Sequence, residues 1–193
     1  MMDKKYLSSI KKNLLQYSEV RREVIKSSDD ALYNAKRAIF AMHRDNTKEA
    51  EEKLTNSKNL LEGLLKKYSK YQEVDEEGSF KAGLEEYVEA NLFYQFLTTG
   101  KIGKITNITI PERSYVGGLC DVPGELYRYA IKSATEKDMD KVRQCANMAQ
   151  EITGELIEFN LTSYLRNKFD QAKMATQKIE QIVYELSLND KKS

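Results

Sequence analysis

Apolar residues recur at helical spacing along nearly the whole chain. The pattern predicts helices over residues 3–44, 48–71, 79–98, 112–135, 138–160 and 162–188. Isoleucines alternate like a strand only within 101–110, and because one short run cannot form a sheet, we expect an ordered loop there. Nothing marks a domain boundary or a repeat, so residues 1–193 are interpreted as a single helical domain. The prediction is an all-α fold, a long-helix bundle of about six to seven helices.

Several helix ends carry local signals. Asn46 or Thr47 is a suitable N-cap for the second helix, and Gly100 is suited to end the third. Pro111 fits the first turn of the fourth helix, where its missing N–H has no helical partner. Pro123 lies inside the same predicted helix and cannot donate its hydrogen bond, so we expect a kink or a helix start near it.

The third predicted helix is apolar on almost every side, which is typical of a helix in a protein interior. It nevertheless carries Glu86 and Glu89, which are three residues apart and therefore lie on one face. Carboxylates are rarely buried without a partner, so we expect other groups to pair with these two. The adjacent Glu85 is expected to face solvent or to cap the helix.

The fourth predicted helix supplies a second acidic pair, Asp121 and Glu125, four residues apart on one stripe. Two consecutive glycines at 117–118 share this stripe and would let the helix approach its neighbour closely. Close approach would bring the two acidic pairs together. The alternative is that Asp121 and Glu125 face solvent and pair with the basic residues that follow them, Arg128 and Lys132.

Four carboxylates in a small space cannot all stay ionised without a cation. Oxygen ligands without histidine or thiolate suit Mg²⁺ or Mn²⁺. Such an ion suits phosphodiester hydrolysis, because it generates hydroxide from water and stabilises charge on the phosphate oxygens. A ferritin-like di-iron site needs Glu-x-x-His pairs, and His43, the single histidine, does not follow a glutamate at that spacing. A serine or cysteine nucleophile would lack a partner base for the same reason.

The net charge of +1 conceals an uneven distribution. Residues 1–45 hold ten Lys or Arg against six Asp or Glu, whereas residues 73–89 hold seven acids against the single Lys81. This asymmetry favours a bound anion near the first segment and a cation near the second, although ordinary solvated helix faces would explain the same runs.

A stripe of the first predicted helix combines cations with aromatic rings, about 120° around the helix from its apolar side. Its members are Arg22, Lys26, Tyr33, Lys36, Arg37, Phe40 and Arg44. Cations can hold phosphates and rings can stack on bases, so the stripe suits single-stranded nucleic acid. Asp29 interrupts it, and an exposed polar face without a ligand is the alternative.

The sequence also indicates a compartment. Cys120 and Cys145 lie within helical patterns and are expected to be small buried thiols in a reducing environment. The first residues lack the apolar run of a signal peptide, and no uncharged stretch is long enough to span a membrane. We therefore expect a cytoplasmic protein that does not enter a membrane.

Several segments of the chain, taken together, point to a known family. Two of them are acidic: EEYVEA followed by FYQF at 85–96, and YVGGLCDVPGEL at 115–126. Two are basic: REVIKS at 22–27, and AKRAIF with HR at 35–44. A further segment, KIE with VYEL, lies at 178–186. In this order the segments resemble the two acidic helices, the basic first helix and the C-terminal helix of the translin/TRAX family, where TRAX is the translin-associated factor X, and the resemblance covers most of the chain.

This resemblance implies an all-α protein that assembles into closed homo-oligomers, commonly octamers, and binds single-stranded RNA and DNA. It also implies a Mg²⁺-dependent endoribonuclease site, which the TRAX branch carries and the translin branch lacks in full. Glu86, Glu89, Asp121 and Glu125 fall on the TRAX catalytic positions, so the chain looks like a TRAX-type member, archaeal or stand-alone. Asp29 departs from the family at a position that is usually basic.

Three hypotheses follow. The leading one is a Mg²⁺- or Mn²⁺-dependent endoribonuclease that cleaves single-stranded RNA with a metal-activated water. The second is a translin-like scaffold that binds single-stranded RNA or DNA without turnover. The third is a structural helical bundle with no salt-sensitive affinity for RNA.

Overall fold

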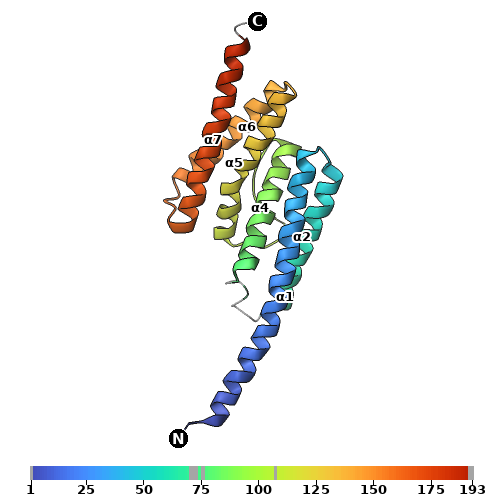
Figure 1. Ribbon diagram of the computed structural model, residues 1–193, viewed down its shortest axis with the longest axis vertical. Coiled ribbons are helices and arrows are strands. Elements are labelled where there is room, and N and C mark those ends of the chain that lie inside the picture. Colours follow the sequence, from blue (N-terminus) through green and yellow to red (C-terminus); the bar gives the residue numbers. More distant parts are fainter. Residues whose placement is uncertain (1, 70–73, 75–76, 107, 191–193) are drawn as a thin grey trace.

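The computed structural model describes residues 2–69, 74, 77–106 and 108–190 of the chain. The helices are α1 (Lys4–His43), α2 (Thr47–Lys67), α4 (Gly78–Thr99), α5 (Glu112–Thr135), α6 (Met139–Ile157) and α7 (Ser163–Asp190), shown in Figure 1. No residue in the described part of the chain is in a β-strand. The predicted all-α bundle is therefore confirmed.

The helix ends follow the local signals in the sequence. The side chain of Asn46 accepts a hydrogen bond from the backbone N–H of Glu49 at 3.2 Å, which caps α2. Gly100 ends α4 in the left-handed conformation, with φ of 71°. One expectation was wrong, since α2 ends at Lys67, before the predicted 71. α5 runs through Pro123, so of the two outcomes expected there a helix start is excluded. Part of the acidic 73–77 connector lies outside the described residues.

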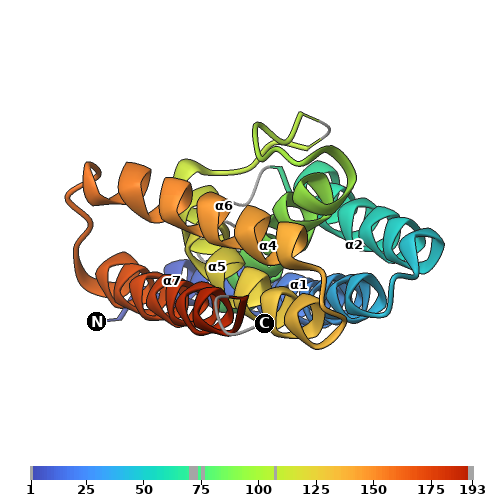
Figure 2. The same ribbon diagram turned by 90° about the horizontal axis from the view of Figure 1, so that it is seen from above.

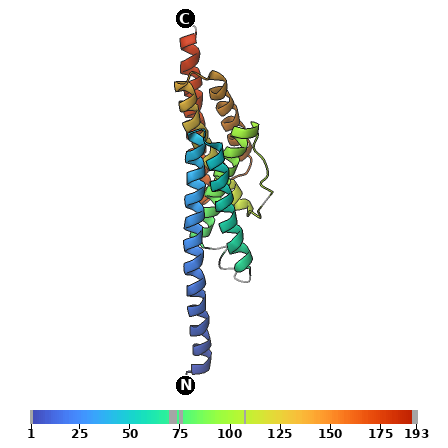
Figure 3. The same cartoon turned by 90° about the vertical axis from the view of Figure 1, so that its right-hand side faces the viewer.

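The helices pack against both adjacent and more distant helices of the chain. α1 contacts α2 and α4, α4 contacts α5, and α5 contacts both α6 and α7. The N-terminal end of α1 and the C-terminal end of α7 project from opposite ends of the bundle (Figures 1 and 3). The described residues of the 101–110 segment are irregular, as expected, and follow the outside of the bundle (Figures 2 and 3). Within the described ranges, no helix is long and apolar enough to cross a membrane.

The centre of the bundle is α4, which is buried nearly all round, as its sequence predicts. Its large buried side chains are Phe80, Leu84, Tyr87, Val88, Leu92, Phe93 and Phe96. The glycines at 117–118 let α5 approach it closely: a Cβ atom added at Gly118 would lie 2.6 Å from the backbone oxygen of Glu85. The two helices that carry the acidic pairs are therefore in direct contact.

Candidate functional site

Three of the four predicted acids border one pocket where α5 lies between α4 and α7. This pocket has a volume of about 250 Å³ and is lined by Glu89, Cys120, Asp121, Gly124, Glu125, Gln171 and Ala172. The fourth acid, Glu86, lies about one helical turn before Glu89 on α4. It is close enough to Asp121 and Glu125 for their charges to affect its pKa. The fold thus brings the two acidic pairs together.

The two acids of α4 are held where an ionised carboxylate is unfavourable. Burial raises the pKa of Glu86 to about 7, and the charges of Asp121 and Glu125 add to this, while Lys36 opposes it. Burial also raises the pKa of Glu89 well above its usual value, and the charges of Glu86, Asp121 and Glu125 add to this. Only 8% of Glu89 is exposed. In the absence of another cation these two side chains therefore tend to keep their protons.

Glu125 has two hydrogen-bonding partners of its own, a histidine and an arginine. One carboxylate oxygen lies 2.5 Å from Nε2 of His43, and Nη1 of Arg128 lies 3.1 Å from both oxygens. Burial alone would raise the pKa of Glu125, but the hydrogen bond to His43 and the charge of Arg128 outweigh it, so the pKa is lowered. Glu125 therefore pairs with Arg128, as the alternative predicted, but it does not face solvent, since only 13% of its side chain is exposed.

Asp121 is paired with a residue that the sequence analysis did not consider. Lys168, on α7, donates a hydrogen bond to Oδ2 of Asp121. Burial raises the pKa of Asp121, and the hydrogen bond and charge of Lys168 offset this only in part. Lys132, the expected alternative partner, instead bonds to Asp45.

Glu85 does not face solvent, and the expectation that it would was wrong. Only 8% of the residue is exposed, and its carboxylate accepts hydrogen bonds from Tyr164 at 2.7 Å and forms an ion pair with Lys168 at 2.9 Å. The reason is the close approach of α5: the missing side chain of Gly117 leaves the space that the Glu85 carboxylate fills.

The donor set is that of a hard divalent ion, since it consists of carboxylate oxygens. Among the residues that the structure describes, no three His, Cys, Asp or Glu side chains converge as a metal-binding group in their present rotamers. Lys168 holds Asp121, and His43 with Arg128 holds Glu125, so both α5 acids point toward protein cations. Metal binding by the four acids stays a prediction.

The predicted nucleic-acid stripe of α1 is exposed at all seven positions. It contacts Glu86 and Arg128, which lie next to the acids of the pocket. Nζ of Lys36 lies 3.9 Å from Oε2 of Glu86, and the guanidinium of Arg128 lies 5.5 Å from the ring centre of Phe40. The basic and aromatic surface and the acids therefore form one continuous region.

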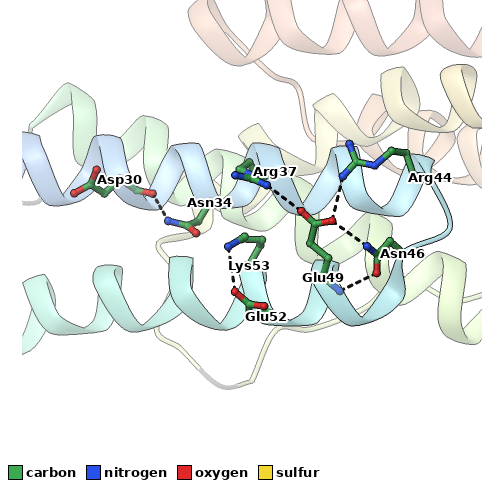
Figure 4. A network of polar contacts seen from close by, with 8 residues as sticks. All are labelled: Asp30, Asn34, Arg37, Arg44, Asn46, Glu49, Glu52 and Lys53. Atoms are coloured by element: carbon green, nitrogen blue, oxygen red, sulfur yellow. Dashed lines mark hydrogen bonds and ion pairs between the residues drawn. The ribbon is translucent and has the colours of Figure 1, made fainter.

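Part of the stripe is already neutralised within the protein. Glu49, on α2, accepts hydrogen bonds from Arg37 at 3.1 Å and Arg44 at 3.2 Å, and Figure 4 shows its carboxylate between the two guanidinium groups. The hydrogen bond from Arg37 is the main cause that lowers the pKa of Glu49, so its charge persists. Any phosphate that binds Arg37 or Arg44 competes with this carboxylate.

Two residues of the site escaped the sequence analysis for different reasons. Lys168 shares an inward helical spacing with Leu165 and Ala172, so a lysine on an otherwise apolar face was the available signal. His43 carries no such signal, because its contact with Glu125 joins residues 82 positions apart.

A larger hollow of about 990 Å³ lies elsewhere, beneath the 104–113 segment. Its lining is mainly apolar, including Ile105, Ile108, Val116 and Leu119. It does not contain the clustered acids or the basic stripe, so hydrolytic chemistry is better sought at the acidic pocket.

The chain is similar to known proteins over most of its length. The protein named translin-associated protein X homolog from Schizosaccharomyces pombe is 26% identical over 98% of this chain and 90% of its own length. Translin-associated protein X from Rattus norvegicus is also 26% identical, over 86% of this chain and 71% of its own.

Solved structures share the fold. AfC3PO matches with a TM-score of 0.87 at 24% identity, over 95% of this chain and 98% of that one. AfC3PO in complex with duplex RNA matches with a TM-score of 0.87 at 23% identity, over 95% and 97%. The model of the Translin family matches residues 19–190. The chain belongs to the Translin family.

Proposed function

We propose that this protein is a Mg²⁺- or Mn²⁺-dependent endoribonuclease that cleaves single-stranded RNA. The observation that carries the proposal is the junction of two surfaces: Lys36 of the exposed basic stripe lies 3.9 Å from Glu86 of the acidic cluster. An RNA strand held along α1 would have its phosphates delivered to the carboxylates. Family membership and the duplex RNA bound by AfC3PO support RNA as the class of ligand.

Each group has a distinct task in this proposal. The cations Arg22, Lys26, Lys36, Arg37 and Arg44 bind phosphates, and the exposed rings of Tyr33 and Phe40 stack on bases. Stacking requires unpaired bases, which is why single-stranded RNA is the expected substrate, with single-stranded DNA as a second ligand.

The four acids Glu86, Glu89, Asp121 and Glu125 would hold the divalent ion. A bound Mg²⁺ or Mn²⁺ supplies activation of water and neutralisation of phosphate charge. One of the carboxylates takes the proton of the attacking water. Lys168 bonds to Oδ2 of Asp121, and His43 bonds to Oε2 of Glu125. An ion shared by both acids would therefore compete with these partners for the same oxygens.

We further propose a homo-oligomer, with an octamer as the expected size, in the cytoplasm. The two free, buried cysteines fit a reducing compartment.

A second function is favoured by one specific observation. Both α5 acids are paired with protein cations, and an acidic cluster neutralised in this way needs no metal. The alternative is therefore a scaffold that binds single-stranded RNA or DNA along α1 and releases it intact.

One assay separates the two. Cleavage of an unstructured RNA and of a duplex is followed with Mg²⁺, Mn²⁺ or EDTA, and RNA affinity is measured in parallel. Asp121→Asn and Glu89→Gln should lower cleavage by about 100-fold or more while binding is retained. Asp140→Asn is the matched control, because the side chain of Asp140 is 88% exposed on α6.

Equal cleavage by wild type and Asp121→Asn that persists in EDTA would exclude the nuclease proposal. Salt-sensitive RNA binding without any cleavage would support the scaffold. The absence of salt-sensitive binding would exclude both and leave a structural role.

A further inference from the structure

Lys168 occupies an unusual position for a lysine. It extends from α7 toward the contact of α4 with α5, and only 14% of its side chain is exposed. Its ammonium group lies 2.9 Å from Oε2 of Glu85, bonds to Oδ2 of Asp121 and donates to the backbone oxygen of Gly117 at 3.3 Å. A lysine has three N–H donors, so all of them have acceptors here.

The Glu85 carboxylate, which pairs with Lys168, is also held in place by its surroundings. Tyr164 donates a hydrogen bond to Oε2 of Glu85 at 2.7 Å. A Cβ atom at Gly117 would lie 2.6 Å from Cδ of Glu85, so α5 is shaped around this carboxylate. Glu85 is thus an anchor that holds Lys168 against Asp121, and it is not among the residues that line the acidic pocket.

Asp121 does line that pocket, together with Glu89 and Glu125. The charge of Lys168 therefore acts on the whole acidic cluster. It favours the ionised forms of Glu86 and Glu89 as well as that of Asp121. A fixed cation at the edge of a cation-binding site weakens binding there by direct repulsion. It also competes for the oxygen of Asp121 that an ion would need.

We propose that Lys168 is a positioning residue that serves as the internal counter-ion of the acidic site, holding Asp121 in place and lowering the affinity of the site for a divalent ion. The inference rests on the proposed metal site. The competing explanation is a buried ion pair that only stabilises the fold, in which case ion affinity would not depend on Lys168.

Binding of Mn²⁺ tests the inference, because free Mn²⁺ is quantified directly by its electron paramagnetic resonance signal. The variants are Lys168→Met, Lys168→Gln and the charge-conserving Lys168→Arg. Lys173→Met is the control, since Lys173 is exposed on the same helix and packs on Phe169. Loss of the charge should tighten Mn²⁺ binding by about tenfold. Lys168→Arg and Lys173→Met should bind as wild type does.

Thermal unfolding gives a second readout. In EDTA, Lys168→Met should melt at a lower temperature than wild type, because Glu85 and Asp121 lose their counter-ion. Added Mn²⁺ should raise its melting temperature more than that of wild type. Lys168→Gln keeps a hydrogen-bond donor, so it tests affinity even if the methionine variant does not fold.

Wild-type Mn²⁺ binding with equal or weaker binding by Lys168→Gln would overturn the inference and leave the proposed nuclease intact. Failure of wild type itself to bind Mn²⁺ would overturn both the inference and the metal dependence of the proposed function.

Discussion

At the scale of single residues, the buried carboxylates of α4 link stability to pH. The pKa of Glu89 in the folded protein is raised well above 4.5 by burial and then by neighbouring acids, and that of Glu86 is raised to about 7. The folded state therefore keeps protons that the unfolded state releases as pH rises above about 4.5. Without a divalent ion, the contribution of these two groups to stability should be fully present below about pH 4.5 and should be lost as pH rises through the folded-state pKa values.

Glu89→Gln should remove part of the loss of stability that occurs as pH rises. In EDTA at pH 8 the variant should be more stable than wild type, because it has no buried carboxyl group to ionise at that position. Urea unfolding at pH 5 and at pH 8 measures the difference. Asp140→Asn is the control, and its curve should follow that of wild type. Parallel pH dependence in wild type and Glu89→Gln would contradict the assigned burial of this charge.

The residue scale also shows what a single sequence can reveal about the site. Glu86 and Glu89 were identifiable because their helix has no polar side on which to place them. Their proximity to Asp121 and Glu125 followed from the glycines of the next helix. The partners of these two α5 acids, His43 and Lys168, come from α1 and α7, and the packing of four helices selects them. Helical periodicity describes one helix at a time, so it does not specify such contacts.

At the scale of helices, the contact between α4 and α5 depends on Gly118. A Cβ atom there would lie 2.6 Å from both the backbone oxygen of Glu85 and Cβ of Val88. The backbone of α4 cannot shift to relieve this clash without disturbing the packing around it. Gly118→Ala should therefore destabilise the protein by about 1–3 kcal/mol.

Gly154 supplies the matched comparison within α6. Nothing lies within 4 Å of a Cβ atom added at this position, so Gly154→Ala should stabilise the protein by about 0.5–1 kcal/mol through helix propensity. Urea unfolding of the two variants should show opposite signs. A destabilisation common to both would mean that the close approach of α4 and α5 is not the cause.

The helices themselves were largely predictable, and their exceptions have physical causes. α5 spans Glu112–Thr135, the range that its apolar spacing predicts. Pro123 does not start a new helix, because its neighbours Val122 and Leu126 are fully buried and tertiary packing outweighs one lost hydrogen bond.

The pairing of α1 with α2 leads to a prediction on RNA affinity. Glu49 holds Arg37 and Arg44, two cations of the proposed phosphate-binding stripe (Figure 4). Glu49→Gln should release both and tighten binding of single-stranded RNA by about threefold to tenfold, with a steeper dependence on salt. Fluorescence anisotropy at several salt concentrations measures both quantities.

Glu52→Gln is the control for this experiment. Glu52 lies on the same helix and pairs with Lys53, which is not in the stripe (Figure 4). Its replacement should leave the affinity unchanged. Equal gains in both variants would attribute the effect to net charge alone, and an unchanged Glu49→Gln would exclude phosphate binding by these two arginines.

At the scale of the whole molecule, the projecting end of α1 bears on assembly. Residues 4–15 are all exposed, and the end of the helix extends beyond the bundle in Figures 1 and 3. Leu7, Ile10 and Leu14 are exposed by 42%, 36% and 61%, at the spacing of three and four residues that is typical of paired helices. A helical segment of this length is marginal in water without a partner.

For the proposed homo-oligomer, we expect a second copy of the chain to cover this segment. In an antiparallel pair of these helices, the exposed leucine and isoleucine side chains of the two copies would meet. Light scattering should therefore give a particle mass well above that of one chain, 22.3 kDa. Leu14→Glu places a charge in the contact and should lower that mass. Ser8→Glu adds the same charge to another face of the helix and should not, so equal masses for wild type and Leu14→Glu would assign assembly to a different surface.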